Sequence, residues 1–147
     1  MSQSSAPYEG RIFIADKSAW ERASDAGVRD EWSEALLQGQ IATCPIVKFE
    51  LLFSARSGAD YDQLDANLSA LRAIPISRSV TNAALSAMRQ LAHRNPPEHR
   101  TPKIPDTLIA AAAQDGSVGV LHYDHHFDLL AEVLSFESRW ISPPGSI

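Results

Sequence analysis

Short apolar segments alternate with longer helix-favouring segments along nearly the whole chain. The apolar runs predict strands at residues 11–15, 41–44, 73–76, 118–123 and 139–141. The segments between them predict helices at residues 18–25, 30–37, 46–56, 61–71, 80–93, 104–114 and 127–134, with the fourth and fifth forming an antiparallel pair. Strands that alternate with helices indicate a parallel sheet covered by helices on both faces. We therefore expect a single α/β domain.

The 147 residues fit one domain with its own core. We place this domain at residues 11–141, between a flexible N-terminus, 1–10, and a tail, 142–147, rich in Pro, Gly and Ser. The N-terminus has no basic or apolar region of the kind found in signal peptides, and no apolar run approaches the roughly 20 residues that span a bilayer. Cys44 is the only cysteine, which excludes an internal disulfide and a cysteine cluster. These features favour a cytoplasmic protein without a membrane partner.

Three aspartates stand where strands end or helices begin. Asp16 follows the first strand, Asp124 ends the strand in VGVLHYD, and Asp106 opens a helix after Pro105. Ligands of open parallel sheets bind beyond the carboxyl ends of the strands, so these residues are candidate site residues. Asp128 lies four positions after Asp124 and shares its helix face. Aspartate is also a favoured N-cap, worth roughly 1 kcal/mol, so each residue taken singly also fits a capping role.

Glu50 lies inside the apolar stretch 46–53. At helical spacing Ile46 and Phe53 share its face, so we expect its carboxylate to point into packed side chains. A buried carboxylate is costly unless it is neutralised or paired, and Lys48 lies on nearly the opposite side. A metal site explains Glu50 well, and a buried Glu–Arg pair is the alternative.

A cluster of carboxylates from separate segments repels itself unless a cation is present. Hard divalent cations prefer oxygen ligands, and two of them can activate water and stabilise the charges of phosphodiester hydrolysis. The net charge of −5 argues against a protein that merely coats nucleic acid, but not against a nuclease. The set that suggests this chemistry is Asp16, Glu50, Asp106, Asp124 and Asp128.

Basic and imidazole side chains lie near these acidic positions. The Pro-rich segment 93–105 carries Arg94, Arg100 and Lys103, which are candidates for contact with RNA phosphates. His125 and His126 are adjacent, and adjacent helical residues diverge by about 100°, so they cannot share one ion. We expect both histidines to face the surface or the RNA.

The segments IFIADKSAW, VKFELLFSAR, IPDTLIAAAA and VLHYDHHFDLLA, in this order, resemble the PIN domain of VapC-type toxins. The resemblance implies Mg²⁺- or Mn²⁺-dependent endoribonuclease activity on structured RNA, commonly tRNA or rRNA. It further implies the toxin role of a type II toxin–antitoxin pair, a VapB-like antitoxin as partner and a homodimer. It assigns catalytic roles to Asp16, Glu50, Asp106 and Asp124, metal ligation to Asp16, Asp106, Asp124 and Asp128, and a supporting role to Ser18.

The sequence departs from this family pattern at His122-Tyr123, where many relatives carry Thr or Ser and a basic residue. Two other α/β classes are excluded by their residues. Lys17 and Ser18 stand where response-regulator receivers and haloacid-dehalogenase-type phosphatases need a second acidic residue. The remaining alternative is a catalytically silent PIN-like module that binds protein or RNA.

Overall fold

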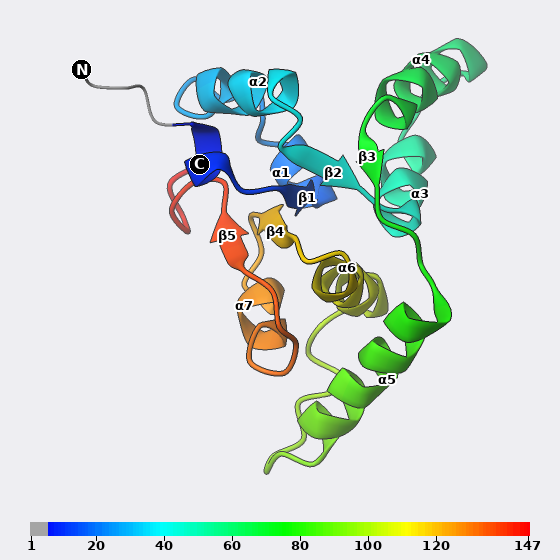
Figure 1. Ribbon diagram of the computed structural model, residues 1–147, viewed down its shortest axis with the longest axis vertical. Helices are drawn as coiled ribbons and strands as arrows, with labels where there is room; N and C mark the ends of the chain where they lie inside the picture. The colour runs from blue at the N-terminus through cyan, green and yellow to red at the C-terminus, as the bar shows by residue number, and fades with distance from the viewer. Residues whose placement is uncertain (1–5) are drawn as a thin grey trace.

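The computed structural model describes residues 6–147 and contains one five-stranded parallel sheet (Figure 1). The strand order is β3-β2-β1-β4-β5, and all four neighbouring pairs are parallel. The strands are β1 (Phe13–Ala15), β2 (Ile41–Thr43), β3 (Arg72–Ala73), β4 (Gly119–His122) and β5 (Ser138–Trp140). This confirms the predicted single α/β domain. Because β1 pairs directly with β4, the residues that follow these two strands meet at one edge of the sheet.

Several helices begin at local capping or proline signals. Ser57 and Ser77 cap α4 and α5, and a proline stands in the first turn of α3 and of α6. None of the helices within residues 6–147 is long and apolar enough to cross a membrane. Their bounds are η1 (Pro7–Gly10), α1 (Lys17–Trp20), α2 (Arg29–Leu37), α3 (Pro45–Phe53), α4 (Gly58–Ser69), α5 (Arg78–Ala92), α6 (Ile104–Asp115) and α7 (His126–Leu130).

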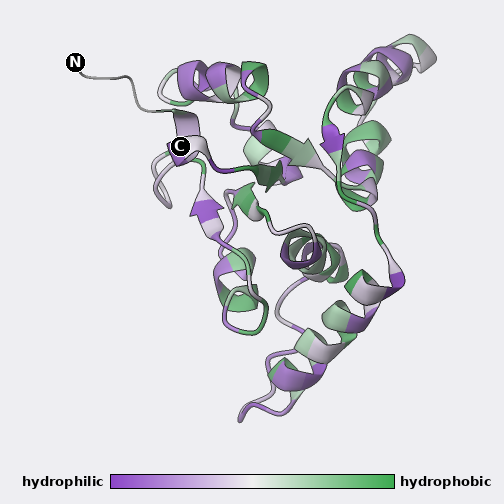
Figure 2. Ribbon diagram, viewed as in Figure 1, coloured by the Kyte–Doolittle hydropathy of each residue, from purple (hydrophilic) through white to green (hydrophobic). Residues whose placement is uncertain are grey.

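The core lies on both faces of the sheet, as predicted. Phe13 and Leu121 pack with α1 and α2 on one face, whereas Ile14 and Val120 pack with α3, α5, α6 and α7 on the other. This alternation follows from the period-two geometry of a strand. The central strands are hydrophobic while the edge strands β3 and β5 are hydrophilic (Figure 2). A sheet buried on both faces positions its carboxyl edge rigidly.

The prediction that the helices at residues 61–71 and 80–93 form an antiparallel pair is wrong. α4 packs beside α3, and α5 packs along α6, so the two lie well apart (Figure 1). β3 is also shorter than the predicted strand, and the extended segment 74–77 carries the chain from the sheet edge to α5. α1 and α7 end at Trp20 and Leu130, several residues before the predicted ends.

Both ends of the described chain contact the rest of the domain. Tyr8 in η1 is buried, with its ring 5.9 Å from that of Phe13, and Glu9 pairs with Arg139 at 2.9 Å. The ordered domain therefore starts before residue 11; residues 1–5 of the expected N-terminal segment lie outside the described residues. At the other end the tail turns back, and the Tyr123 hydroxyl donates to the Ile147 carbonyl over 3.0 Å.

Candidate metal centre and active site

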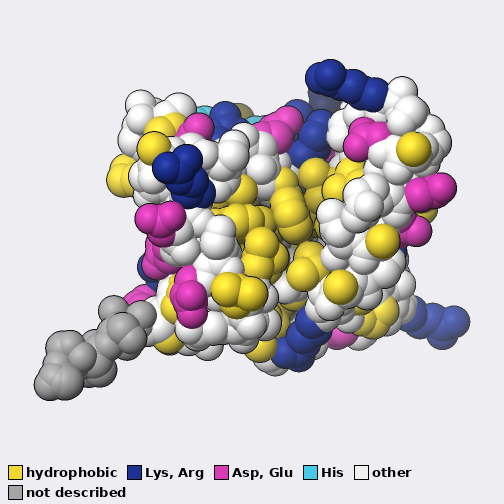
Figure 3. All heavy atoms as spheres, turned by 90° about the horizontal axis from the view of Figure 1, so that it is seen from above, with side chains coloured by type: hydrophobic (Ala, Val, Ile, Leu, Met, Phe, Trp, Pro, Cys, Tyr) yellow, Lys and Arg dark blue, Asp and Glu magenta, His cyan; other side chains and the backbone are white. Residues whose placement is uncertain are grey.

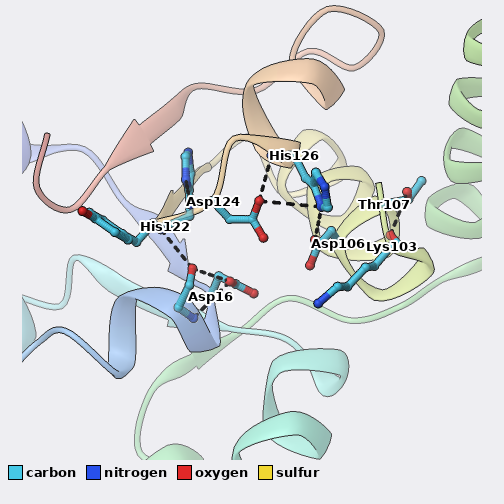
Figure 4. A network of polar contacts seen from close by, with 9 residues as sticks. Asp16, Lys103, Asp106, Thr107, His122, Asp124 and His126 are labelled. Atoms are coloured by element: carbon cyan, nitrogen blue, oxygen red, sulfur yellow. Dashed lines mark hydrogen bonds and ion pairs between the residues drawn. The ribbon is translucent and has the colours of Figure 1, made fainter. Parts of the chain in front are cut away.

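Three aspartates converge at the carboxyl edge of the sheet (Figure 4). Asp16 follows β1, Asp124 follows β4 after one intervening residue, and Asp106 lies in the first turn of α6. Asp16 and Asp106 are both only 5% exposed. Burial of two carboxylates at one sheet edge is typical of a functional site, because each isolated buried charge is destabilising.

Asp106, Asp124 and His126 form a group that could hold a metal ion. One ligand atom from each lies within 4.8 Å of the others. The His126 Nδ1 atom lies 3.4 Å from Asp106 Oδ2 and 3.6 Å from Asp124 Oδ1. Asp124 Oδ1 also accepts the backbone N–H of His126 at 2.9 Å, which fixes the turn before α7. Two carboxylates suit Mg²⁺ or Mn²⁺, and an imidazole is a common additional ligand of transition metals. The residues therefore fit a divalent cation.

Asp16 has the capping role and also belongs to the acidic cluster. Its Oδ2 atom accepts the Ser18 backbone N–H at 3.1 Å and the Ser18 hydroxyl at 2.6 Å. The Ser18 hydroxyl oxygen in turn accepts the backbone N–H of Tyr123 at 2.9 Å. Ser18 thus connects the carboxylate after β1 to the backbone after β4.

The electrostatics of the cluster favour a bound cation. Burial raises the pKa of Asp106 to about 7, with further contributions from the charges of Asp16 and Asp124. Burial also raises the pKa of Asp16, while hydrogen bonds from Ser18 oppose this shift. These raised pKa values reflect an energetic cost of holding several carboxylates together, and a divalent cation would offset it.

Glu50 lies at the rim of this site and not in the packed core that the sequence predicts. It is partly buried, and Phe53 on the same helix is 92% exposed, so that face of α3 is not fully covered. Burial, and then the charge of Asp16, raise the pKa of Glu50, while Lys17 and Lys103 lower it. No arginine forms an ion pair with Glu50 within residues 6–147, which removes the alternative of a structural Glu–Arg pair.

The prediction that Asp128 joins the metal ligands is not supported by its contacts. Its Oδ1 atom accepts the Ser138 hydroxyl at 2.6 Å, and its Oδ2 atom accepts the Trp140 indole N–H at 2.9 Å. Asp124 precedes α7, which starts at His126, so the four-residue spacing does not place the two aspartates on one helix face. Asp128 lies in the first turn of α7 and faces β5. It therefore lies outside the group formed by Asp106, Asp124 and His126.

The three basic side chains of segment 93–105 have different surroundings. The Lys103 side chain extends toward the space between Asp16 and Asp106 (Figure 4), and Arg100 is exposed. Arg94 instead pairs with Glu98 at 3.0 Å and with Glu132 at 2.9 Å. These ion pairs connect the end of α5 with the segment after α7, so the Arg94 side chain stabilises the fold. The Lys103 side chain lies at the acidic site instead.

Two histidines were not predicted as site residues. The two adjacent histidines, expected to face the surface or the RNA, differ in their surroundings: His125 is exposed, whereas His126 is partly buried and contacts Asp106. The divergence of about 100° keeps them from sharing an ion, and it also turns one of them inward. His122 is fully buried, and burial lowers its pKa to about 4. The one signal for His126 was its position two residues after an aspartate at a helix start.

The chain matches known proteins over most of its length. The model of the PIN domain matches residues 13–133. Ribonuclease VapC18 of Mycobacterium tuberculosis is 38% identical over 136 residues, covering 92% of this chain and 99% of that protein. Ribonuclease VapC51 of the same organism is 37% identical over 135 residues, covering 92% and 96%. The chain therefore belongs to the PIN-domain family, in the branch of the VapC ribonucleases.

Solved structures show the same fold. A DNA-bound VapBC complex from Salmonella typhimurium contains a chain that matches with a TM-score of 0.69 at 14% identity, covering 90% of this chain and 99% of that one. VapBC-5 from Mycobacterium tuberculosis, a member of the VapBC family of toxin–antitoxin systems, matches with a TM-score of 0.61 at 21% identity, covering 88% and 98%. The family resemblance drawn from the four sequence segments is confirmed.

Proposed function

We propose that this protein is a divalent-metal-dependent endoribonuclease that acts as the toxin of a toxin–antitoxin pair and cleaves structured RNA, either tRNA or rRNA. The observation that carries this proposal is the convergence of Asp106, Asp124 and His126, with one ligand atom each within 4.8 Å, beside the buried Asp16. Relatives that are 37–38% identical are named ribonucleases, which supports the activity.

Each residue of the site has an assigned task. Asp106, Asp124 and His126 would hold Mg²⁺ or Mn²⁺, which supplies positive charge beside the scissile phosphate and lowers the pKa of water. Asp16, oriented by Ser18, and Glu50 at the rim are the remaining carboxylates, and we assign them to orient and deprotonate the attacking water.

Lys103 is the basic residue best placed to contact the substrate. Its side chain extends into the acidic site, where an ammonium group can bind a phosphate oxygen of the RNA (Figure 4). Arg100, exposed in the same loop, is a second candidate for this contact. Arg94 is engaged by two glutamates, so we assign it no RNA contact.

A VapB-like antitoxin is the proposed partner. Solved relatives of this fold are VapBC complexes, two of them bound to DNA. Viewed from above, the surface between α2 and the arm of α3 and α4 is hollowed and lined largely by hydrophobic side chains (Figure 3). Such a surface fits an apolar antitoxin segment, and an Arg or Lys that follows it would reach the carboxylates.

We also propose a homodimer, which light scattering of the purified protein would test.

Purified protein should cleave a total tRNA and rRNA mixture with Mg²⁺ or Mn²⁺ and stop when chelator is added in excess. Sequencing of the new RNA ends identifies the target. Undiminished cleavage in chelator would contradict the metal mechanism. Specific RNA binding without cleavage under any metal would instead favour the catalytically silent module.

Expression from the native locus should copurify a small protein that suppresses cleavage. An active chain that is harmless to growth would contradict the toxin role.

A further inference from the structure

The imidazole of His122 is held in a closed environment next to the proposed metal centre. It is the last residue of β4, two positions before Asp124, and it is 0% exposed. Its ring centroid lies 4.9 Å from that of Phe127 and 5.1 Å from that of Trp140. Both ring nitrogens have hydrogen-bond partners, Asp124 on one side and Ser138 on the other. These two hydrogen bonds fix the orientation of the ring.

His122 belongs to a series of hydrogen bonds that runs from the Asp124 backbone N–H through His122 and Ser138 to Asp128. The groups at the two ends of this series set the direction of each bond. The backbone N–H of Asp124 can only donate, so His122 Nδ1 accepts it at 3.1 Å. The exposed Asp128 carboxylate can only accept, so the Ser138 hydroxyl donates to it at 2.6 Å. The Ser138 oxygen then accepts from His122 Nε2 at 2.7 Å.

Only one form of the ring satisfies all three contacts. It is the neutral imidazole with its proton on Nε2. The other tautomer would place a ring N–H against the backbone N–H of Asp124, so two donors would face each other inside the protein. The Trp140 indole, which donates to Asp128 at 2.9 Å, keeps that carboxylate in place at the outer end.

We propose that His122 is a positioning residue of the metal centre: the relay of Asp128, Ser138 and His122 fixes the backbone at Asp124 and so directs its carboxylate toward Asp106. This inference rests on the proposed function, because it takes Asp124 as a metal ligand. The preceding backbone N–H, that of Tyr123, is held from another side by Ser18. The two successive amides after β4 are thus anchored separately, and Asp128 acts on the centre through the relay and not as a ligand.

The tautomer can be measured without metal or activity. Two-bond ¹H–¹⁵N correlation spectra of the full-length protein, with ¹⁵N-labelled histidine, should show His122 as the Nε2–H form at neutral pH. Ser138→Ala should shift its Nε2 resonance. A predominant Nδ1–H form in the parent protein overturns the proposal.

Metal affinity tests the positioning role. Calorimetric titration with Mn²⁺ should give a dissociation constant about 10-fold higher for Ser138→Ala, the lower end of what outer-shell partners contribute. Ser138→Thr, which keeps the hydroxyl, should restore the affinity. Leu134→Ala, which thins the neighbouring core without touching the relay, should lower the melting temperature but leave the affinity unchanged. Parent-like affinity in Ser138→Ala overturns this inference alone, whereas a parent protein that binds no Mn²⁺ overturns the proposed function.

Discussion

The His126 Nδ1 atom lies 3.4 Å from Asp106 Oδ2, although the two residues are 20 positions apart in the chain. This contact joins the first turn of α6 to the first residue of α7. It brings an imidazole into a site that the sequence predicted to be built from carboxylates alone.

His126→Gln should weaken Mn²⁺ binding and RNA cleavage, because the imidazole ligand is lost while a polar side chain of similar reach remains. We expect the Mn²⁺ affinity and the cleavage rate each to fall by about 10-fold or more, comparable with the loss of other groups that hold a metal in place. His125→Gln is the matched control, because the exposed neighbour should change neither quantity. Equal effects of the two substitutions would contradict the assignment of His126.

Asp106→Asn and Asp16→Asn should lower cleavage by about 100-fold or more, the order of loss seen when one charge-stabilising group leaves an active site. Asn keeps the shape and part of the hydrogen bonding but removes the charge. The melting temperature in chelator should hold steady or rise, since one member of a repelling cluster has gone. Asn caps helices nearly as well as Asp, so full activity in Asp16→Asn would favour mere capping of α1. Asp106 caps no helix, so full activity in Asp106→Asn would contradict its assignment to the site.

Glu50→Gln should also reduce cleavage strongly while the free energy of unfolding is preserved. A structural Glu–Arg pair would lose about 3–5 kcal/mol on removal of one partner. Burial and Asp16 both raise the Glu50 pKa, so its charge is a cost to the metal-free fold, and the neutral amide relieves that cost. Urea denaturation with and without Mg²⁺ separates these outcomes. Substantial destabilisation of Glu50→Gln in chelator would contradict our placement of this residue.

The stability of the metal-free protein should depend on pH through Asp106. Its pKa is about 7 in the fold, against about 4 in an unfolded chain. Between these values the folded state binds a proton that the unfolded state does not, so stability falls as pH rises from about 4 to 7 and then levels off. Urea midpoints in chelator should follow this trend, and Asp106→Asn should reduce the slope, leaving the contributions of Asp16 and Glu50, whose pKa values are also raised. An unchanged slope in Asp106→Asn would contradict the role of Asp106.

Gly119→Ala should destabilise the fold by about 1–3 kcal/mol, as other overpacking changes do. A Cβ atom there would lie 2.6 Å from the Phe13 ring and 2.8 Å from the Glu137 carbonyl oxygen, which β-sheet pairing holds in place. Gly58→Ala is the matched control, because nothing lies within 4 Å of its Cβ and alanine favours helix. Denaturant unfolding should separate the two variants clearly; equal midpoints would contradict this packing.

The sheet and three site residues could be predicted because they depend on local patterns. Asp16, Asp106 and Asp124 stand next to strand ends or helix starts, and parallel strands end at one edge. Helical spacing placed Asp128 on the face of Asp124, but Asp124 precedes α7, and the Asp128 carboxylate accepts hydrogen bonds from β5 instead.

Other features depended on contacts that spacing in the sequence does not encode. The packing of α4 on α3 and of α5 on α6 is decided by which apolar faces meet in space. The inward turn of His126 depends on the hydrogen bond from its own backbone to Asp124. The partial exposure of Glu50 follows from the uncovered face of α3, where Phe49 is 74% exposed.

The pairing of β1 with β4 has a consequence for the order in which the protein is made. β1 can pair with β2 early, but Phe13 also pairs with Gly119, so the second neighbour of β1, the strand β4, exists only after about a hundred further residues have been synthesised. A nascent chain that has emerged only as far as α5 carries Asp16 and Glu50 but neither Asp106 nor Asp124. The proposed metal centre is divided in this way, so it cannot assemble until the chain has been synthesised beyond Asp124.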